Sequence, residues 1–273
     1  MKLENAYLRV SVETGNQFEE AVKTPGVELI YLDAGFFAKE DLRGLVRACH
    51  KGSGGIGKLC GLRLPRIWRT EAEEFFQNRK EEIRAAGFDC FLSPNIEGAL
   101  FLREAELSED GSNVVLDHSI YRMNSATENA LERILGMDRY SETFSLEMSS
   151  RELLQDKTSR KREFCVYGRV PMMVTAQCIR KTSLRCDRRM CTMILRDRTG
   201  AMLPVKNCCT FCYNTIYNSV PSVITDLAEE IRDIGPDSVR YEFTTENAEE
   251  MKKVLRGEMP KNYTRGHFHK EVL

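Results

Sequence analysis

Eight short apolar runs, most of them followed by a longer stretch with helical spacing of apolar residues, constrain the fold more than any other feature. The first two units pair YLRVSV with NQFEEAVKT and ELIYLDA with KEDLRGLVRAC. Seven such runs lie between residues 7 and 175, and the eighth, SVRYEF, precedes a last helical stretch, ENAEEMKKVLRGE. Strands that alternate with helices form a parallel sheet. Eight units of this kind predict an α/β fold, a TIM-like (β/α) barrel.

The regular alternation stops between the seventh and eighth expected strands. All six cysteines from Cys178 to Cys212 lie in this interval, together with CTMILRDRTGAMLPV, whose DRTG turn predicts a hairpin. We therefore expect a single barrel domain over residues 1–273, with residues 176–215 as a cysteine-rich, metal-binding insertion.

Four of these cysteines have the spacing C-x7-C-x22-C-x2-C: Cys178, Cys186, Cys209 and Cys212. A C-x2-C pair brings two thiolates to one metal, and two more cysteines across a hairpin complete the four-sulfur shell of zinc ribbons and iron–sulfur clusters. The spacing does not distinguish zinc from an iron–sulfur cluster. Cys191 and Cys208 are reserve ligands. The remaining cysteines are isolated, and we expect them to be ordinary buried thiols: Cys49, Cys60, Cys90 and Cys165.

Polar residues near the carboxyl ends of the strands are the other site candidates, because the active site of a TIM barrel lies there. The candidate catalytic residues are Glu147, Arg169 and Asp117. The candidate substrate-binding residues are Arg63, Arg66, Asn95 and Asn124. Arginine binds carboxylates and phosphates in bidentate fashion, and a glutamate in a barrel mouth can act as a general base. An alternative role for a polar residue at a strand end, such as Asp33 or Asn95, is to cap the next helix.

Composition and terminal sequence limit the partners and the compartment. The formal net charge is −1, so no global field attracts DNA or an anionic membrane. The opening MKLENAYLRVSVETG lacks the pattern of a secretory signal, and no run of about 18 apolar residues occurs. We expect a cytoplasmic protein, in which reduced thiols favour metal ligation or burial over disulfides. Lys and Arg are concentrated between Lys157 and Arg189; by default they form a solvated face, and alternatively they bind RNA.

Three segments of the chain resemble the collagenase-like peptidase family, peptidase family U thirty-two. They are EFCVYGRVPMMVTAQC (163–178), LRDRTGAMLPV (195–205) and CTFCYNTIYNSVP (209–221), and the likeness to its shorter, C-terminal-type barrel unit covers nearly the whole chain. The resemblance implies a TIM-like barrel whose four cysteines hold a four-iron four-sulfur cluster. The family signature has a further cysteine where this chain has Pro171, so the expected ligands are the four cysteines of the C-x7-C-x22-C-x2-C pattern.

Three functions remain open at this point. The resemblance favours an iron–sulfur-dependent enzyme subunit that supports hydroxylation of an RNA base or a small aromatic ring. The family label implies an endopeptidase, although the sequence contains neither G-x-S-x-G nor H-E-x-x-H. The third is a non-catalytic subunit in which a structural zinc ion holds the cysteine-rich insertion together. The expected partners are a paralogous barrel protein or longer family member, and RNA; neither a membrane nor DNA is predicted.

Overall fold

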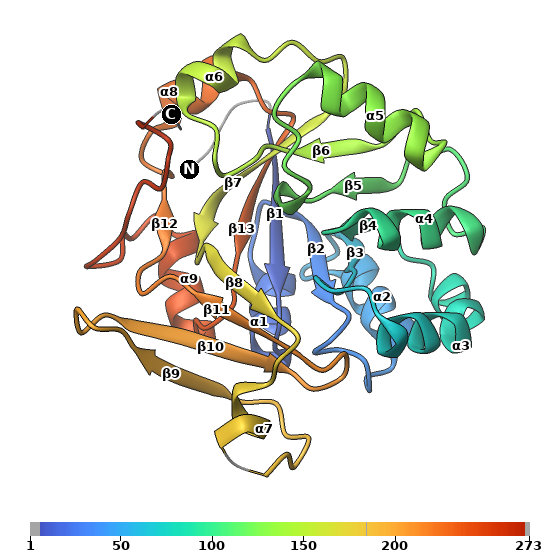
Figure 1. Cartoon of the computed structure of the whole chain (residues 1–273). Helices are drawn as coiled ribbons and strands as arrows, with labels where there is room; N and C mark the ends of the chain where they lie inside the picture. Colours follow the sequence, from blue (N-terminus) through green and yellow to red (C-terminus); the bar gives the residue numbers. More distant parts are fainter. Residues whose placement is uncertain (1–5, 184, 271–273) are drawn as a thin grey trace.

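Eight parallel strands close into a barrel in the computed structural model, which describes residues 6–183 and 185–270 (Figure 1). In chain order the strands are β1 (Tyr7–Val12), β2 (Val27–Asp33), β3 (Leu59–Arg63), β4 (Cys90–Ser93), β5 (Val114–Leu116), β6 (Ser141–Thr143), β7 (Arg162–Gly168) and β13 (Ser238–Glu242). Each strand pairs in parallel with the next, and β13 pairs with both β7 and β1. The predicted TIM-like barrel is therefore confirmed.

Helices follow most of the strands and cover the outside of the barrel (Figure 1). They are α1 (Gly15–Lys23), α2 (Leu42–Lys51), α3 (Thr70–Ala86), α4 (Ile96–Glu104), α5 (Ser125–Leu135), α6 (Ser150–Gln155), α8 (Ala228–Ile234) and α9 (Ala248–Leu255), with a 3-10 turn, η1 (His118–Ile120), after β5. Local sequence sets their ends. Thr14 and Gln17 form a capping box at the start of α1, and Gly87, at φ 75°, ends α3 in the left-handed conformation. Among the described residues, no helix is long and apolar enough to cross a membrane.

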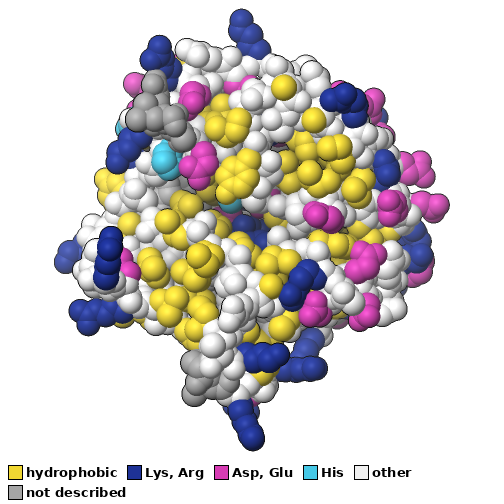
Figure 2. Space-filling view, in the orientation of Figure 1, with side chains coloured by type: hydrophobic (Ala, Val, Ile, Leu, Met, Phe, Trp, Pro, Cys, Tyr) yellow, Lys and Arg dark blue, Asp and Glu magenta, His cyan; other side chains and the backbone are white. Residues whose placement is uncertain are grey.

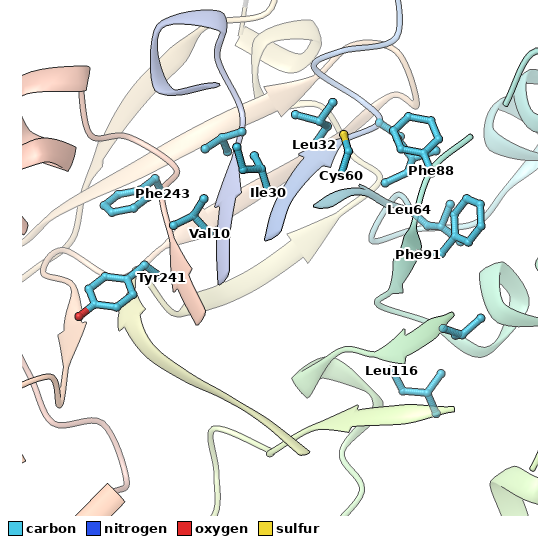
Figure 3. Packing of buried hydrophobic residues seen from close by; sticks show 14 of the residues in the cluster. Val10, Ile30, Leu32, Cys60, Leu64, Phe88, Phe91, Leu116, Tyr241 and Phe243 are labelled. Atoms are coloured by element: carbon cyan, nitrogen blue, oxygen red, sulfur yellow. The ribbon is translucent and has the colours of Figure 1, made fainter. Parts of the chain in front are cut away.

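The main hydrophobic core lies between the strands and the helices. Val10 of β1, Ile30 of β2 and Phe243 after β13 are buried there, as the close view of the core illustrates (Figure 3), and so is Val12 of β1. Complete burial of one such aliphatic or aromatic side chain contributes about 1.5–3 kcal/mol. The alternate residues of each strand point inward, because successive side chains of a strand lie on opposite faces.

Residues 171–217, which lie between barrel strands β7 and β13 in the chain, form a second, smaller sheet. Its strands are β8 (Pro171–Thr175), β9 (Thr192–Arg196), β10 (Met202–Cys208) and β11 (Tyr213–Tyr217). They pair in the antiparallel order β8-β11-β10-β9, and the short helix α7 (Ile179–Ser183) lies between β8 and β9 in the chain. The sheet extends beyond the expected limits of 176–215 because PMMVT pairs with YNTIY. The DRTG turn joins β9 to β10 as expected, and β12 (Ser222–Val223) then returns to pair with β7.

Candidate functional site

The four cysteines of the C-x7-C-x22-C-x2-C pattern line one cavity of about 210 Å³, which also borders Glu71 at the start of α3. This four-cysteine cavity lies between the β10–β11 turn, the segment that joins β8 to β9, and the start of α3. The thiols of Cys178 and Cys209 are partly buried, whereas Cys186 and Cys212 are exposed. Residues far apart in the sequence are therefore brought together here by the fold of the second sheet.

The turn between β10 and β11 carries the C-x2-C pair. Cys208 pairs with Tyr213 across the hairpin, so the four residues 209–212 form the connection. Cys212 has a φ of 53°, a left-handed conformation that is uncommon for a residue with a Cβ. The side-chain amide of Asn207 donates to Cys209 Sγ at 3.1 Å and to the carbonyl oxygen of Arg189 at 2.9 Å. These contacts tie the C-x2-C turn to the segment that precedes β9.

Neighbouring thiols surround Cys209. Burial raises the pKa of Cys209, and the negative charges that Cys186, Cys178, Cys191 and Cys212 carry as thiolates raise it further. A bound cation reverses this effect, because it favours the thiolate form of every ligand. The donor set therefore matches a positively charged metal centre.

The thiols surround the cavity without forming a closed coordination shell. Within residues 6–183 and 185–270, no three His, Cys, Asp or Glu side chains are close enough together to hold a metal ion. Since a zinc–sulfur bond measures about 2.3 Å, the thiols would have to draw together around a metal. Four thiolates fit zinc and a four-iron cluster equally well in donor chemistry. Of the reserve ligands, Cys191 accepts from Arg180 Nη1 at 3.2 Å, and Cys208 is buried against the barrel.

Polar and aromatic contacts hold the second sheet against α3 and against the residues that follow β1, β2 and β13. The Lys206 ammonium pairs with Glu13 and donates to the Thr244 carbonyl at 2.6 Å. The Thr210 hydroxyl donates to the Gly35 carbonyl at 2.7 Å. Phe211, inside the C-x2-C turn, stacks on Phe76 of α3 with ring centroids 5.9 Å apart. The four-cysteine cavity is thus fixed beside the end of the barrel where active sites of this fold lie.

The barrel interior combines an apolar half with a charged half. Leu29, Tyr31, Cys90, Leu92 and Val115 form a small apolar cluster inside it. The charged half, called the inner charge network below, joins the side chains of Arg9, Arg63, Arg66, Arg240, Asp117, Glu163 and Glu242. Buried ion pairs add little net stability, because desolvation offsets most of their attraction. Their concentration inside a barrel therefore favours a functional explanation.

Three of the predicted site residues belong to this network. Arg63 Nη1 and Arg66 Nη2 donate to the same oxygen, Glu242 Oε1, at 2.9 and 2.7 Å. Arg63 Nη2 also lies 3.3 Å from Asp117 Oδ2. The arginines hold the pKa of Asp117 and of Glu242 well below the usual range, against the opposing effect of burial. Both carboxylates are therefore anionic at neutral pH.

The other two catalytic candidates lie toward the rim of the barrel. Glu147 is four residues beyond the end of β6, which is shorter than the sequence suggests, and its Oε2 lies 3.2 Å from His267 Nε2. Arg169 follows β7; its guanidinium donates to Thr245 Oγ1 at 2.9 Å and to the Ser219 carbonyl at 2.6 Å. Both line cavities described below, and their catalytic roles stay predictions.

The two asparagine candidates are helix caps. Asn95 Oδ1 accepts from the Gly98 amide at 2.7 Å at the start of α4, and its side-chain amide donates to the Pro65 carbonyl at 2.7 Å. Asn124 Oδ1 accepts from the Thr127 amide at 3.0 Å at the start of α5. These bonds engage the side chains locally, and substrate binding by either residue stays a prediction. Asp33 likewise accepts from the Gly35 amide at 2.9 Å.

Sequence reasoning missed several members of the inner charge network. Arg240 and Glu242 alternate with apolar residues in SVRYEF, and Glu163 stands two positions before Cys165, which is not a member of the network, in REFCVYG. One local signal would have found these network residues. Where a charged residue stands two positions from another charged or polar residue in an otherwise apolar strand, both side chains point to the same face, into the barrel.

Two cavities meet at the carboxyl ends of the barrel strands. The larger, of about 390 Å³, is bordered by Leu146, Glu147, Pro171, His267 and Phe268 among others. The smaller, of about 10 Å³, lies beside it and is bordered by His118, Arg169 and Glu242. Figure 2 shows this barrel mouth as a hollow near the centre of the view, ringed by hydrophobic side chains, with basic, acidic and histidine side chains at its base.

Comparisons with known proteins add little to this picture. No protein-family model and no curated protein matches the sequence. Similar solved structures include a protein assigned as a fructose-1,6-biphosphate aldolase from Coccidioides immitis, 12% identical over 58% of this chain and 64% of that one, with a TM-score of 0.41. The YdjI aldolase from Escherichia coli K12 is 12% identical over 58% and 66% of the two chains, with a TM-score of 0.39.

The matched part spans less than two thirds of each aldolase, and likeness at this level says nothing about the activity of this chain. The likeness to these two aldolases does not test the resemblance to the collagenase-like peptidase family, which stays a prediction.

Proposed function

We propose that this protein is an iron–sulfur-dependent enzyme subunit that supports hydroxylation of an RNA base or a small aromatic ring. The observation that carries the proposal is the convergence of Cys178, Cys186, Cys209 and Cys212 on one cavity beside the barrel mouth. An iron–sulfur cluster on these thiols would supply electron transfer. The substrate would lie in the barrel mouth, where the fold carries its active sites.

A continuous set of contacts joins the two places, which supports a shared role. The hydroxyl of Tyr213, beside the C-x2-C turn, accepts a hydrogen bond from the Arg66 amide at 3.4 Å. The Arg66 guanidinium in turn donates to Glu242 at the base of the barrel mouth. Residues that hold the four-cysteine cavity in place therefore also touch the inner charge network.

The alternatives have weaker support. A structural zinc ion fits the same four thiols, and only metal analysis distinguishes it. The endopeptidase alternative needs an activated nucleophile, and the thiol in the barrel mouth, Cys165, is a poor one because burial raises its pKa to about 12. The family label alone does not compensate for that.

An RNA substrate is consistent with the charge around the cysteines. Arg185, Arg188 and Arg189 are exposed next to the ligand Cys186, and phosphate contacts from such a group give salt-dependent binding. The proposal includes action in the cytoplasm, where the thiols stay reduced, and a partner of the same family as a second barrel.

Mass spectrometry of nucleosides tests the function directly. RNA from a strain that lacks the gene should have lost a hydroxylated nucleoside, one that is heavier than its unmodified form by one oxygen atom and is present in RNA from the wild-type strain. The wild-type gene should restore it, whereas a Cys212→Ser gene should not and a Cys49→Ser gene should, because Cys49 is buried between α2 and the barrel. Unchanged RNA, together with unchanged small aromatic metabolites, would contradict the proposed function.

A further inference from the structure

His118 occupies an unusual position at the base of the barrel mouth. It lies two residues beyond the end of β5 and is 7% exposed, yet its Nε2 has no hydrogen-bond partner among the described residues. Buried polar atoms are nearly always hydrogen bonded, so an orphaned one calls for a partner that is absent from the chain itself. The imidazole borders the small cavity of about 10 Å³, which is just enough for one water molecule or one hydroxyl group.

Glu242 presents a second open atom to the same small cavity. Its Oε1 accepts from Arg63 and Arg66, but its Oε2 lies 3.6 Å from Arg240 Nη2 and 3.8 Å from His118 Nε2. Neither distance is a hydrogen bond. A polar gap of this size is commonly bridged by an oxygen that bonds to both sides.

The small cavity adjoins the large one. Leu146, Cys165, Val170, Pro171 and Ser222 border both, so a ligand group held at His118 has its remainder in the cavity of about 390 Å³. Apolar and aromatic side chains provide much of that lining, including Met148, Phe164, Ile224 and Phe268. Glu147, Arg265, His267 and Lys270 also border this cavity, and the apolar part of its lining suits an apolar body with one polar end.

The charges at the base select the kind of polar end. The carboxylates of Asp117 and Glu242 lie near His118 Nε2, each with one oxygen at 3.8 Å, and both are held anionic by arginines. The guanidinium of Arg169, the other basic group in the lining, is already bonded to Thr245, Asn218 and Ser219. A carboxylate or phosphate held at His118 would lie next to the Glu242 carboxylate, and no arginine among the lining residues of the small cavity is without a partner.

We propose that the barrel mouth is a ligand site for an uncharged compound that carries a hydroxyl group on an apolar body, with His118 and Glu242 holding the hydroxyl. The hydroxyl donates to Glu242 Oε2 and accepts from an N–H at His118 Nε2. This inference rests on the proposed function for its place in a reaction, but the binding itself requires no metal.

Binding of simple probes to the full chain tests the site. Phenol has the required hydroxyl, anisole has the same ring with the donor removed, and benzoate has a charged end. Ligand-observed NMR titration should give at least about tenfold tighter binding of phenol than of either analogue, which is the effect of one buried hydrogen bond. Equal affinity for phenol and anisole, or a preference for benzoate, would overturn the proposal.

Two further measurements locate the binding. In His118→Phe the preference for phenol over anisole should disappear, while the matched change His50→Phe, at an exposed histidine of α2, should preserve it. A crystal of the unmodified protein soaked in phenol should place the hydroxyl within hydrogen-bond distance of His118 Nε2 and Glu242 Oε2, and phenol bound elsewhere would contradict the site. This second readout does not depend on the folding of a variant.

The same titration on Cys209→Ser/Cys212→Ser separates this inference from the proposed function. That variant should keep the preference for phenol. A protein that binds no metal but prefers phenol would contradict the proposed function alone. A protein that binds an iron–sulfur cluster but does not distinguish phenol from anisole would contradict this inference alone.

Discussion

Arg63 Nη1 lies 2.9 Å from Glu242 Oε1 inside the barrel, and both side chains are almost completely buried. The pair joins β3 to β13, strands that are not neighbours in the sheet. Asp117, after β5, approaches the same guanidinium from a third strand. The charges at the base of the barrel mouth are therefore held in place by contacts across the barrel as well as by the strands that carry them.

Removing one member of this pair should destabilise the protein strongly. Arg63→Met removes one of the two arginines that contact Glu242 Oε1 and one of the two that contact the Asp117 carboxylate, all of them buried. We expect a loss of up to about 3–5 kcal/mol in the free energy of unfolding. Arg139→Met, at a solvent-exposed pair with Asp110, should leave it nearly unchanged. Urea denaturation of the two variants measures the difference, and equal losses would show that the inner charge network is not special.

Asp33 should make stability depend on pH. Burial and the nearby Glu13 charge raise its pKa from 3.8 to about 6. Because the folded state favours the protonated acid, this contribution is fully present below about pH 4 and is lost as the pH rises through 6. The loss is about 3 kcal/mol, from 1.36 kcal/mol per pKa unit. The stability of Asp33→Asn relative to the wild type should therefore rise between pH 4 and pH 7. A flat difference in the free energy of unfolding would show that Asp33 titrates normally.

Gly35 should be required where the second sheet meets the barrel. A Cβ at this position would lie 2.4 Å from Cys208 Sγ and 3.1 Å from Asp33 Oδ1. We expect Gly35→Ala to destabilise the protein by about 1–3 kcal/mol, the usual effect of overpacking. The control is Gly15→Ala, whose Cβ would meet nothing within 4 Å.

A second substitution identifies the clash. Cys208→Ala removes the sulfur that the new methyl group would meet, so the double variant should be less destabilised than the sum of the single variants. Cys208→Ala should also leave the metal content unchanged if Cys208 is only a packing residue. Additive losses in thermal or chemical denaturation would contradict the proposed contact.

The barrel was predictable from the sequence because most of its strands have a recognisable local sequence pattern. Runs such as ELIYLDA and SVRYEF are rich in apolar residues, and each is followed by a stretch whose apolar residues have helical spacing. Counting these strand–helix pairs along the sequence gives the eight units of the barrel. Short strands were harder to delimit: β6 comprises only Ser141–Thr143, and the apolar FSL that follows it lies in a loop.

The barrel mouth was only partly predictable. Asp117, Arg63 and Arg66 follow from their places near strand ends, and the alternation in SVRYEF places Arg240 inside the barrel. The partners of Arg240 and His118, however, include residues more than 100 positions away in the chain, and no local pattern identifies them. The second sheet shows the same limit. PMMVT becomes a strand of that sheet only because YNTIY, about 40 residues later, pairs with it.

Metal and acid-labile sulfide analysis of anaerobically purified protein tests the central claim most directly. We predict brown protein with about four irons and four sulfides per chain, complete loss of both in Cys209→Ser and in Cys212→Ser, and full retention in Cys49→Ser, whose thiol is completely buried in the barrel core. Colourless wild-type protein that carries one zinc ion or no metal, or a cluster that survives in Cys212→Ser, would contradict the iron–sulfur account.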